Sequence, residues 1–218
     1  MIKGIIFDLD GTTLNTLQDI HDSFNQAFKE KGLEEKSLDE VRMGVGRGFR
    51  VLTQKLIPEG IEEEKTEEIA LRYRQIYSQN YYKNTRPYEG VGELLSQLQE
   101  LGLQMAVQSN KSDVFVKDLI ARNFPDIRFI EVCGSLENIA LKPDPQGVYR
   151  IMEKMKLSKQ EVLYVGDSET DMKTAKNAGL NSVGVLWGFR NEKTLKENGA
   201  DHIIKEPKEL LKIIKEYQ

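Results

Sequence analysis

Short apolar segments rich in β-branched residues alternate with longer amphipathic segments along most of the chain. The apolar segments are typical of buried strands in a parallel sheet, and the amphipathic segments are typical of the helices that cover such a sheet. The predicted strands are residues 2–7, 104–108, 129–132, 162–165, 183–186 and 202–204. This alternation predicts an α/β fold, a doubly wound parallel sheet with helices on both faces.

Two of the predicted helices have clear C-terminal signals. Apolar residues recur every three or four positions from Val91 to Leu101, and Gly102 follows as a C-terminal cap. A later helix contains Met172 and ends at Gly179. Both glycines are therefore expected to stop a helix before the next strand begins.

One long segment, from residue 16 to about residue 82, contains no strand pattern and reads as helical throughout. Within it, Thr16–Asp19 and Ser37–Glu40 resemble N-terminal capping boxes. We therefore expect an all-helical cap domain, residues 16–83, inserted into a core domain made of residues 1–15 and 84–218.

The composition sets limits on the class of protein. The chain has 218 residues, 39% of them apolar and 30% charged, which lies within the globular range. Its net charge of -4 gives no indication of nucleic-acid binding, and no apolar stretch approaches the ~20 residues of a membrane span. Cys133 is the only cysteine, so no intramolecular disulfide can form. These features predict a cytoplasmic protein without nucleic-acid or membrane partners.

Polar residues follow four of the predicted strands, at the points where those strands end. The carboxyl ends of parallel strands line the ligand crevice of an α/β sheet, so side chains at these points are expected to meet. Asp8 and Asp10 should also point the same way, because side chains alternate along an extended chain. The candidates, in chain order, are Asp8, Asp10, Ser109, Asn110, Lys142, Asp167, Glu169 and Asp171.

Acids gathered with one lysine and one hydroxyl fit magnesium-assisted phosphoryl transfer. Mg²⁺ prefers oxygen ligands and usually takes one or two carboxylates, here Asp8 and Asp167, together with substrate phosphate. Two like charges about 4 Å apart repel by roughly 4 kcal/mol at an effective dielectric constant near 20, so a cation and Lys142 are needed to offset this repulsion. Ser109 and the amides around Asn110 can donate hydrogen bonds to phosphoryl oxygens.

Four segments together resemble the ordered motifs of the haloacid dehalogenase superfamily of phosphatases. They are D-L-D-G-T-T from Asp8, S-N from Ser109, K-P from Lys142 and G-D-S-E-T-D from 166 to 171. The resemblance spans nearly the whole chain, and the helical insertion is similar to the cap domain of that family. The S-N-K, K-P-D-P and W-G-F segments most resemble those of phosphoglycolate phosphatases and their pyrophosphatase relatives.

The resemblance implies a role for each residue of the motifs. Asp8 would be the nucleophile that takes the phosphoryl group as an aspartyl phosphate. Asp10 would be the general acid and base, with its backbone carbonyl on Mg²⁺, and Asp167 would complete the metal site. An acid at Asp10 argues against dehalogenation, because a halide leaving group needs no proton. The residues expected to hold the phosphoryl group are Ser109, Asn110 and Lys142, and Asp171 and Glu169 are expected to lie just outside the metal site.

The substrate is expected to be a small phosphorylated metabolite similar to 2-phosphoglycolate. Arg47, in the glycine-rich segment 44–49, is a candidate contact for its anionic group. Two alternatives within the same family are a β-phosphoglucomutase-type isomerase and a pyrophosphatase. A more distant alternative is a phosphoacceptor signalling module, which also gathers aspartates and a lysine at strand ends but is about half as long and has no helical cap.

Overall fold

The computed structural model describes residues 1–137 and 139–217. Its centre is a six-stranded sheet in the order β5-β4-β1-β6-β7-β8 with every neighbouring pair parallel. The strands are β1 (Gly4–Phe7), β4 (Gln104–Ser112), β5 (Glu131–Ser135), β6 (Val162–Gly166), β7 (Asn181–Val185) and β8 (His202–Ile204). All six overlap a predicted strand or follow it directly, so the predicted doubly wound parallel sheet is confirmed.

The predicted end of β4 was wrong. The strand continues past Gln108 to Ser112, because its pairing with β5 resumes at Ser112 and Ser135 after an irregularity. Ser109 and Asn110 therefore lie within the strand, at its carboxyl end, and not in the loop beyond it.

Helices cover both faces of the sheet, and β1 shows how the alternation of side chains divides the core. Ile5 and Phe7 pack in one apolar cluster with α5, α6 and α10, whereas Ile6 packs in a second cluster with α7 and α8. Gly102 and Gly179 follow α5 and α8 with positive φ, as predicted. The bounds are α5 (Val91–Glu100), α6 (Asp113–Asn123), α7 (Gln146–Met155), α8 (Glu169–Ala178), α9 (Glu192–Glu197) and α10 (Leu210–Glu216).

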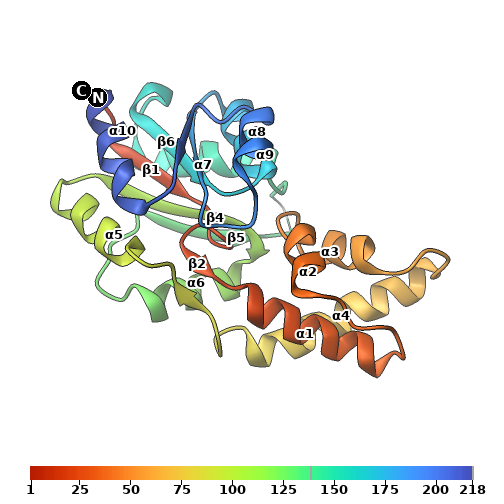
Figure 1. Cartoon of the computed structure of the whole chain (residues 1–218). Helices are drawn as coiled ribbons and strands as arrows, with labels where there is room; N and C mark the ends of the chain where they lie inside the picture. The colour runs from red at the N-terminus through yellow and green to blue at the C-terminus, as the bar shows by residue number, and fades with distance from the viewer. Residues whose placement is uncertain (138, 218) are drawn as a thin grey trace.

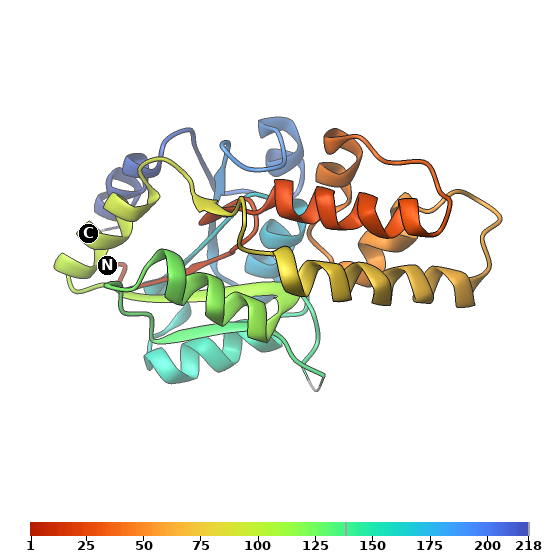
Figure 2. The same ribbon diagram turned by 90° about the horizontal axis from the view of Figure 1, so that it is seen from below.

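Four further helices lie together beside one end of the sheet (Figures 1 and 2). They are α1 (Leu17–Glu30), α2 (Leu38–Gly44), α3 (Phe49–Leu56) and α4 (Glu63–Asn80). Aromatic packing joins α1 to α4, with the ring centres of Phe24 and Tyr73 5.5 Å apart. None of the helices in the described part of the chain is long and apolar enough to span a membrane.

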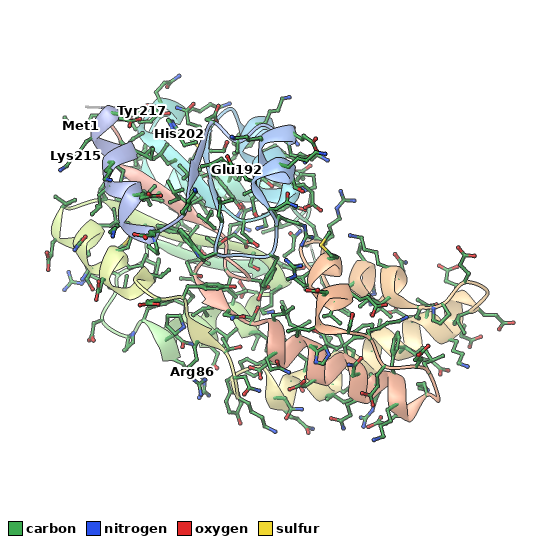
Figure 3. All side chains as sticks on the ribbon, in the orientation of Figure 1. Met1, Arg86, Glu192, His202, Lys215 and Tyr217 are labelled. Carbon is green, nitrogen blue, oxygen red and sulfur yellow. The ribbon has the colours of Figure 1, made fainter. Side chains whose placement is uncertain are left out.

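The two chain ends lie next to each other at the end of the molecule opposite α1–α4 (Figures 1 and 2). His202 and Tyr217, labelled there in Figure 3, are joined by a 2.8 Å hydrogen bond. The carboxyl ends of the central strands face the other way, toward α1–α4, so any site at those ends lies between the sheet and these helices.

The two chain segments that connect the sheet to α1–α4 pair with each other as β2 (Leu14–Asn15) and β3 (Arg86–Pro87). Figure 3 labels Arg86 at this junction. The pair was not predicted, since two-residue strands have no detectable periodicity. The buried carboxylate of Asp19, on α1, accepts hydrogen bonds from the backbone amides of Asn84 and Thr85 and so fixes the two segments together.

The predicted capping box at Thr16–Asp19 was wrong. Thr16 is the N-terminal cap of α1, but its side chain makes no capping bond and donates instead to Asp10 Oδ1 at 2.6 Å. The Asp19 carboxylate accepts hydrogen bonds from Asn84 and Thr85, which follow α4, and not from the start of α1. The capping box at Ser37–Glu40 is present at the start of α2, as predicted.

Candidate active site

Asp8 follows β1 directly and is paired with a buried lysine. Its Oδ1 forms an ion pair with Lys142 Nζ and accepts a hydrogen bond from the Leu9 backbone amide, both at 2.7 Å. Lys142 comes from the loop before α7, is only 4% exposed, and also donates to Asp171 Oδ1 at 2.7 Å. One ammonium group therefore lies between two buried carboxylates.

Asp167 follows β6 and is fully buried. Thr12 Oγ1 donates to its Oδ1 at 3.2 Å, and the Phe189 backbone amide donates to its Oδ2 at 2.7 Å. A Cβ on Gly11 or on Gly188 would lie 2.3 Å from an Asp167 atom, so both positions require glycine for the loops to approach this closely.

Asp171 lies in the first turn of α8, and its two carboxylate oxygens bind different partners. Its Oδ2 accepts from the backbone amide and hydroxyl of Ser168, which completes a capping box, while its Oδ1 accepts from Lys142. The helix start and the position of the lysine are therefore fixed by the same carboxylate.

Asp8, Asp167 and Asp171 form what we call the carboxylate group, because each offers an oxygen within 4.8 Å of the others. Burial raises the pKa of Asp167 to about 7, and the charge of Asp171 adds to the shift. Burial, followed by the charge of Asp171, also raises the pKa of Asp8 well above its usual value, although Lys142 opposes this. Burial alone would lower the pKa of Lys142, but the charges of Asp171 and Asp8 outweigh burial and keep it well above its usual value.

The donor set of the carboxylate group fits a magnesium ion. Its ligand atoms are all oxygens, and its three buried acids face only one buried lysine, which leaves surplus negative charge. A divalent cation held by Asp8 and Asp167 would neutralise that surplus and favour the ionised carboxylates.

Asp10 lies outside the carboxylate group, on the side facing the helices. Its Oδ1 accepts from Thr16 Oγ1 at 2.6 Å and pairs with Lys111 Nζ at 2.9 Å. Asp8 and Asp10 both line one cavity of about 70 Å³ between the strand ends and α1, α3 and α4. The two aspartates thus line the same space, although β1 ends at Phe7 and both lie beyond the strand whose alternation was the basis of the prediction.

Ser109 and Asn110 lie close to Lys142 but engage different partners. The Ser109 hydroxyl is buried and accepts from the Lys111 backbone amide at 3.1 Å. The Asn110 side chain accepts from the Lys142 backbone amide and donates to the carbonyls of Lys142 and Gly46. Asn110 therefore positions the Lys142 loop, and a direct contact of Asn110 with phosphate stays a prediction.

Glu169 and Arg47 are not part of the carboxylate group. Glu169 pairs with the buried guanidinium of Arg190 at 2.9 Å. Arg190 also donates to the carbonyls of Arg42 and Val45 near the end of α2, which ties the core to the helices. Arg47 is exposed and is absent from the described residues that line the cavity, so its role in substrate selection stays a prediction.

Several residues of the site were given no role from the sequence. Lys111 belongs to the S-N-K segment at the end of a predicted strand, but its pairing with Asp10 was not predicted. Trp187, whose Nε1 donates to the Thr12 carbonyl, and Arg190 act through contacts distant in sequence that no local pattern reveals. The side of the cavity formed by α1, α3 and α4 is lined by Ile20, Phe49, Leu52, Tyr73, Arg74 and Tyr77.

Comparisons with known proteins agree with this geometry. A family model described as haloacid dehalogenase-like hydrolase matches residues 5–185. The chain is 31% identical to a phosphoglycolate phosphatase of Vibrio parahaemolyticus over 98% of this chain and 96% of that protein.

Two solved structures are similar over almost their whole length. A predicted phosphoglycolate phosphatase from Haemophilus somnus has a TM-score of 0.90, is 30% identical, and is matched over 98% of each chain. A protein of Lactobacillus delbrueckii subsp. bulgaricus has a TM-score of 0.92 at 26% identity, with 97% of this chain and 98% of that one matched.

Proposed function

Because the chain belongs to the haloacid dehalogenase-like hydrolase family, we propose that it is a magnesium-dependent phosphatase that forms an aspartyl phosphate at Asp8. The family and the names of its relatives make the chain a phosphoric monoester hydrolase. The observation that carries the proposed mechanism is the buried carboxylate group, held around Lys142 at the strand ends.

The two oxygens of Asp8 have different partners, which supports Asp8 Oδ2 as the nucleophile. Oδ1 pairs with Lys142 Nζ and accepts a hydrogen bond from the Leu9 amide, whereas no donor within residues 1–137 and 139–217 reaches Oδ2. Oδ2 therefore attacks the phosphorus atom, and Lys142 offsets the charge that the phosphoryl group brings. Asp8, Asp167 and the Asp10 backbone carbonyl would hold Mg²⁺, which would neutralise further negative charge of the phosphoryl group.

Asp10 acts as the general acid and then as the general base. As the bond between phosphorus and the ester oxygen breaks, the Asp10 carboxyl donates its proton to the leaving oxygen. The resulting carboxylate then takes a proton from the water that attacks the aspartyl phosphate, which releases inorganic phosphate and regenerates Asp8. The contacts of Asp10 Oδ1 with Thr16 Oγ1 and Lys111 Nζ hold the carboxyl group on the side from which the leaving group departs.

We propose that residues 16–83 form the cap domain and that residues 1–15 and 84–218 form the core domain. The paired segments β2 and β3 support this division, because they are the two connections between the sheet and α1–α4. The inferred substrate is a small phosphorylated metabolite such as 2-phosphoglycolate, in line with the names of the relatives. The cytoplasmic location and the lack of a nucleic-acid partner stay predictions.

Phosphate release from a panel of substrates tests this function. The panel contains 2-phosphoglycolate, pyrophosphate, β-glucose 1-phosphate and an aryl phosphate, each with Mg²⁺ and with a chelator. We expect release of phosphate from 2-phosphoglycolate. Chelation should lower the activity by at least about 100-fold, and added Mg²⁺ should restore it. Preferential hydrolysis of pyrophosphate, or conversion of the sugar phosphate without net phosphate release, would replace this function with one of the alternatives.

A further inference from the structure

The cavity beyond Asp10 is lined by several residues with hydrogen-bond donors that the proposed mechanism does not use. Its wall of helices is mostly apolar and aromatic, with Ile20, Phe49, Leu52 and Tyr73 among its residues. A leaving group attached to a phosphoryl group at Asp8 must occupy this space, because Asp8, Asp10 and the helices line the same cavity. The donors in it are therefore placed to select the leaving group.

Lys111 is the first of these donors. Its side chain is 7% exposed, and its Nζ lies 2.9 Å from Asp10 Oδ1 and 4.8 Å from the centre of the Tyr77 ring. An ammonium group has three N–H donors, and the bond to Asp10 uses one of them. Lys111 therefore keeps donors and a positive charge for a second anionic partner.

Tyr77, on α4, supplies the second donor. The residue is 3% exposed, and its hydroxyl has no hydrogen-bond partner among residues 1–137 and 139–217. A buried hydroxyl without a partner is costly, and in a residue that lines a cavity a ligand can supply the missing partner. Burial, with the nearby charges of Asp10 and Asp19, raises the pKa of Tyr77 well above its usual value, so the hydroxyl stays protonated and able to donate.

Arg74 lies on the same helix and also lines the cavity. Its guanidinium packs over the Phe49 ring at 5.6 Å, and no carboxylate in the described part of the chain forms an ion pair with it. The cavity beyond Asp10 is thus lined by residues that carry an ammonium, a phenol and a guanidinium, while Asp8 and Asp10 are the acidic residues among the described lining residues.

We propose that Tyr77 and Lys111, with Arg74 beside them, form a subsite for a carboxylate on the leaving group. A carboxylate only accepts hydrogen bonds, so it matches a set of groups that only or mainly donate. This inference rests on the proposed phosphatase function and deepens it: the substrate is a phosphate monoester whose leaving group carries a carboxylate. It gives this role to Tyr77, Lys111 and Arg74, whereas the sequence had suggested Arg47.

The variant Tyr77→Phe tests the subsite, because it removes only the hydroxyl. Two substrates of similar size are compared: 2-phosphoglycolate, and ethyl phosphate, which has an uncharged leaving group. We expect kcat/KM for 2-phosphoglycolate to fall about tenfold, through a higher KM, and kcat/KM for ethyl phosphate to stay within about twofold. The thermal midpoint should stay the same or rise, because an unpartnered buried hydroxyl is removed.

Tyr81→Phe is the matched control, because the Tyr81 hydroxyl already has a partner, Asp118, at 2.6 Å and Tyr81 is not among the cavity residues. This control should leave the ratio of kcat/KM for the two esters unchanged. Equal losses for both esters in Tyr77→Phe, or a clear drop in its thermal midpoint, would mean that Tyr77 serves packing alone and would overturn the proposal.

A second pair of variants tests the same subsite without altering its buried part. Arg74→Gln should raise KM for 2-phosphoglycolate several-fold, and Arg50→Gln, which removes an exposed arginine paired with Glu67, should not. A rise in KM for Arg47→Gln and none for Arg74→Gln would overturn the assignment. If the parent hydrolyses ethyl phosphate as well as 2-phosphoglycolate, the subsite fails while the phosphatase function stands; if the parent hydrolyses no ester, the function itself fails.

Discussion

The two sides of the cavity are built in different ways. On the side of the sheet, the carboxylate group is held by paired hydrogen bonds, such as those from Thr12 and Phe189 to Asp167. On the side of the helices, the lining is aromatic and aliphatic, and it includes the Tyr77 hydroxyl, which lacks a partner among the described residues. Satisfied polar contacts fix the atoms that react, whereas apolar packing with spare donors leaves room for a ligand.

This difference suggests that the sheet side carries out the reaction and that the helical side selects the substrate. Strand ends are rigid, so residues on them can be placed accurately enough for bond making and breaking. Side chains on the inserted helices contact only the leaving group and can therefore decide which ester is accepted. Changes on the sheet side should affect every substrate, and changes on the helical side should affect only some.

The largest effect is expected for Asp8→Asn, on the sheet side. An amide of the same shape is a far poorer nucleophile and metal ligand, so turnover should fall by about 1,000-fold or more for every ester. Circular dichroism and the thermal midpoint should show an intact fold. Activity toward an aryl phosphate within about tenfold of the parent would show that Asp8 is not the nucleophile.

The next largest effect is expected for Asp10→Asn, at the border between the two sides. Loss of the acid should slow hydrolysis of alkyl phosphates by roughly 100-fold, because an alkoxide leaves poorly without a proton. Aryl phosphates, whose leaving groups need little protonation, should lose much less in the bond-breaking step. Equal losses in a single-turnover assay of both substrate types would remove the role of acid from Asp10.

A smaller effect concerns stability without metal. The pKa of Asp167 is about 7 in the folded chain, above its usual value. The folded state therefore binds more protons than the unfolded state between about pH 4 and pH 7, and its stability should fall as the pH rises through this window. Asp167→Asn should thus stabilise the metal-free protein at pH 8 by on the order of 2 kcal/mol, and not at pH 4, because the removed charge outweighs the weakened hydrogen bonds.

Chemical denaturation of the metal-free protein at the two pH values measures this difference. Added Mg²⁺ should stabilise the parent at pH 8 and have little effect on Asp167→Asn. Equal changes in the stability of the parent and of Asp167→Asn between pH 4 and pH 8 would contradict this role of Asp167, and equal responses of both proteins to Mg²⁺ would contradict the metal site.

The smallest effect is expected for Arg190→Ala, which removes the link between the core and the end of α2. Its guanidinium donates to the carbonyls of Arg42, Met43 and Val45, so its loss should cost about 1 kcal/mol locally. Amide hydrogen exchange in residues 38–45 should become roughly fivefold faster, while β1 and β6 stay protected. Uniformly faster exchange across the sheet would show that Arg190 stabilises the whole fold and not this contact.

The sheet side was largely predictable from the sequence. The strands β1 and β6 are short apolar runs followed at once by an aspartate, Asp8 and Asp167, so a local pattern marks both the strand and the residue it presents. The end of β4 was missed because its last residues are polar and continue the strand only through pairing with β5.

The helical side was much less predictable. An amphipathic pattern places Tyr73 and Tyr77 on the buried face of α4 but does not say which of them meets Lys111, because that depends on how the helix lies against the sheet. Asp19 looked like part of a capping box, yet it binds a segment more than sixty residues away. The glycines around Arg47 drew attention to that arginine, whose role in substrate selection stays a prediction, whereas no local pattern marked Arg74, which lines the cavity from α4.

The most direct test of the account is to trap the phosphoryl group on the protein. The variant Asp10→Asn is mixed with a radiolabelled aryl phosphate and quenched in acid, since this variant should form the aspartyl phosphate from an activated ester and hydrolyse it slowly. We expect labelled protein to accumulate, with the label on the peptide that contains Asp8. Hydroxylamine should release this label. Turnover of the ester with no labelled protein at any time, or a label on another residue, would contradict the account.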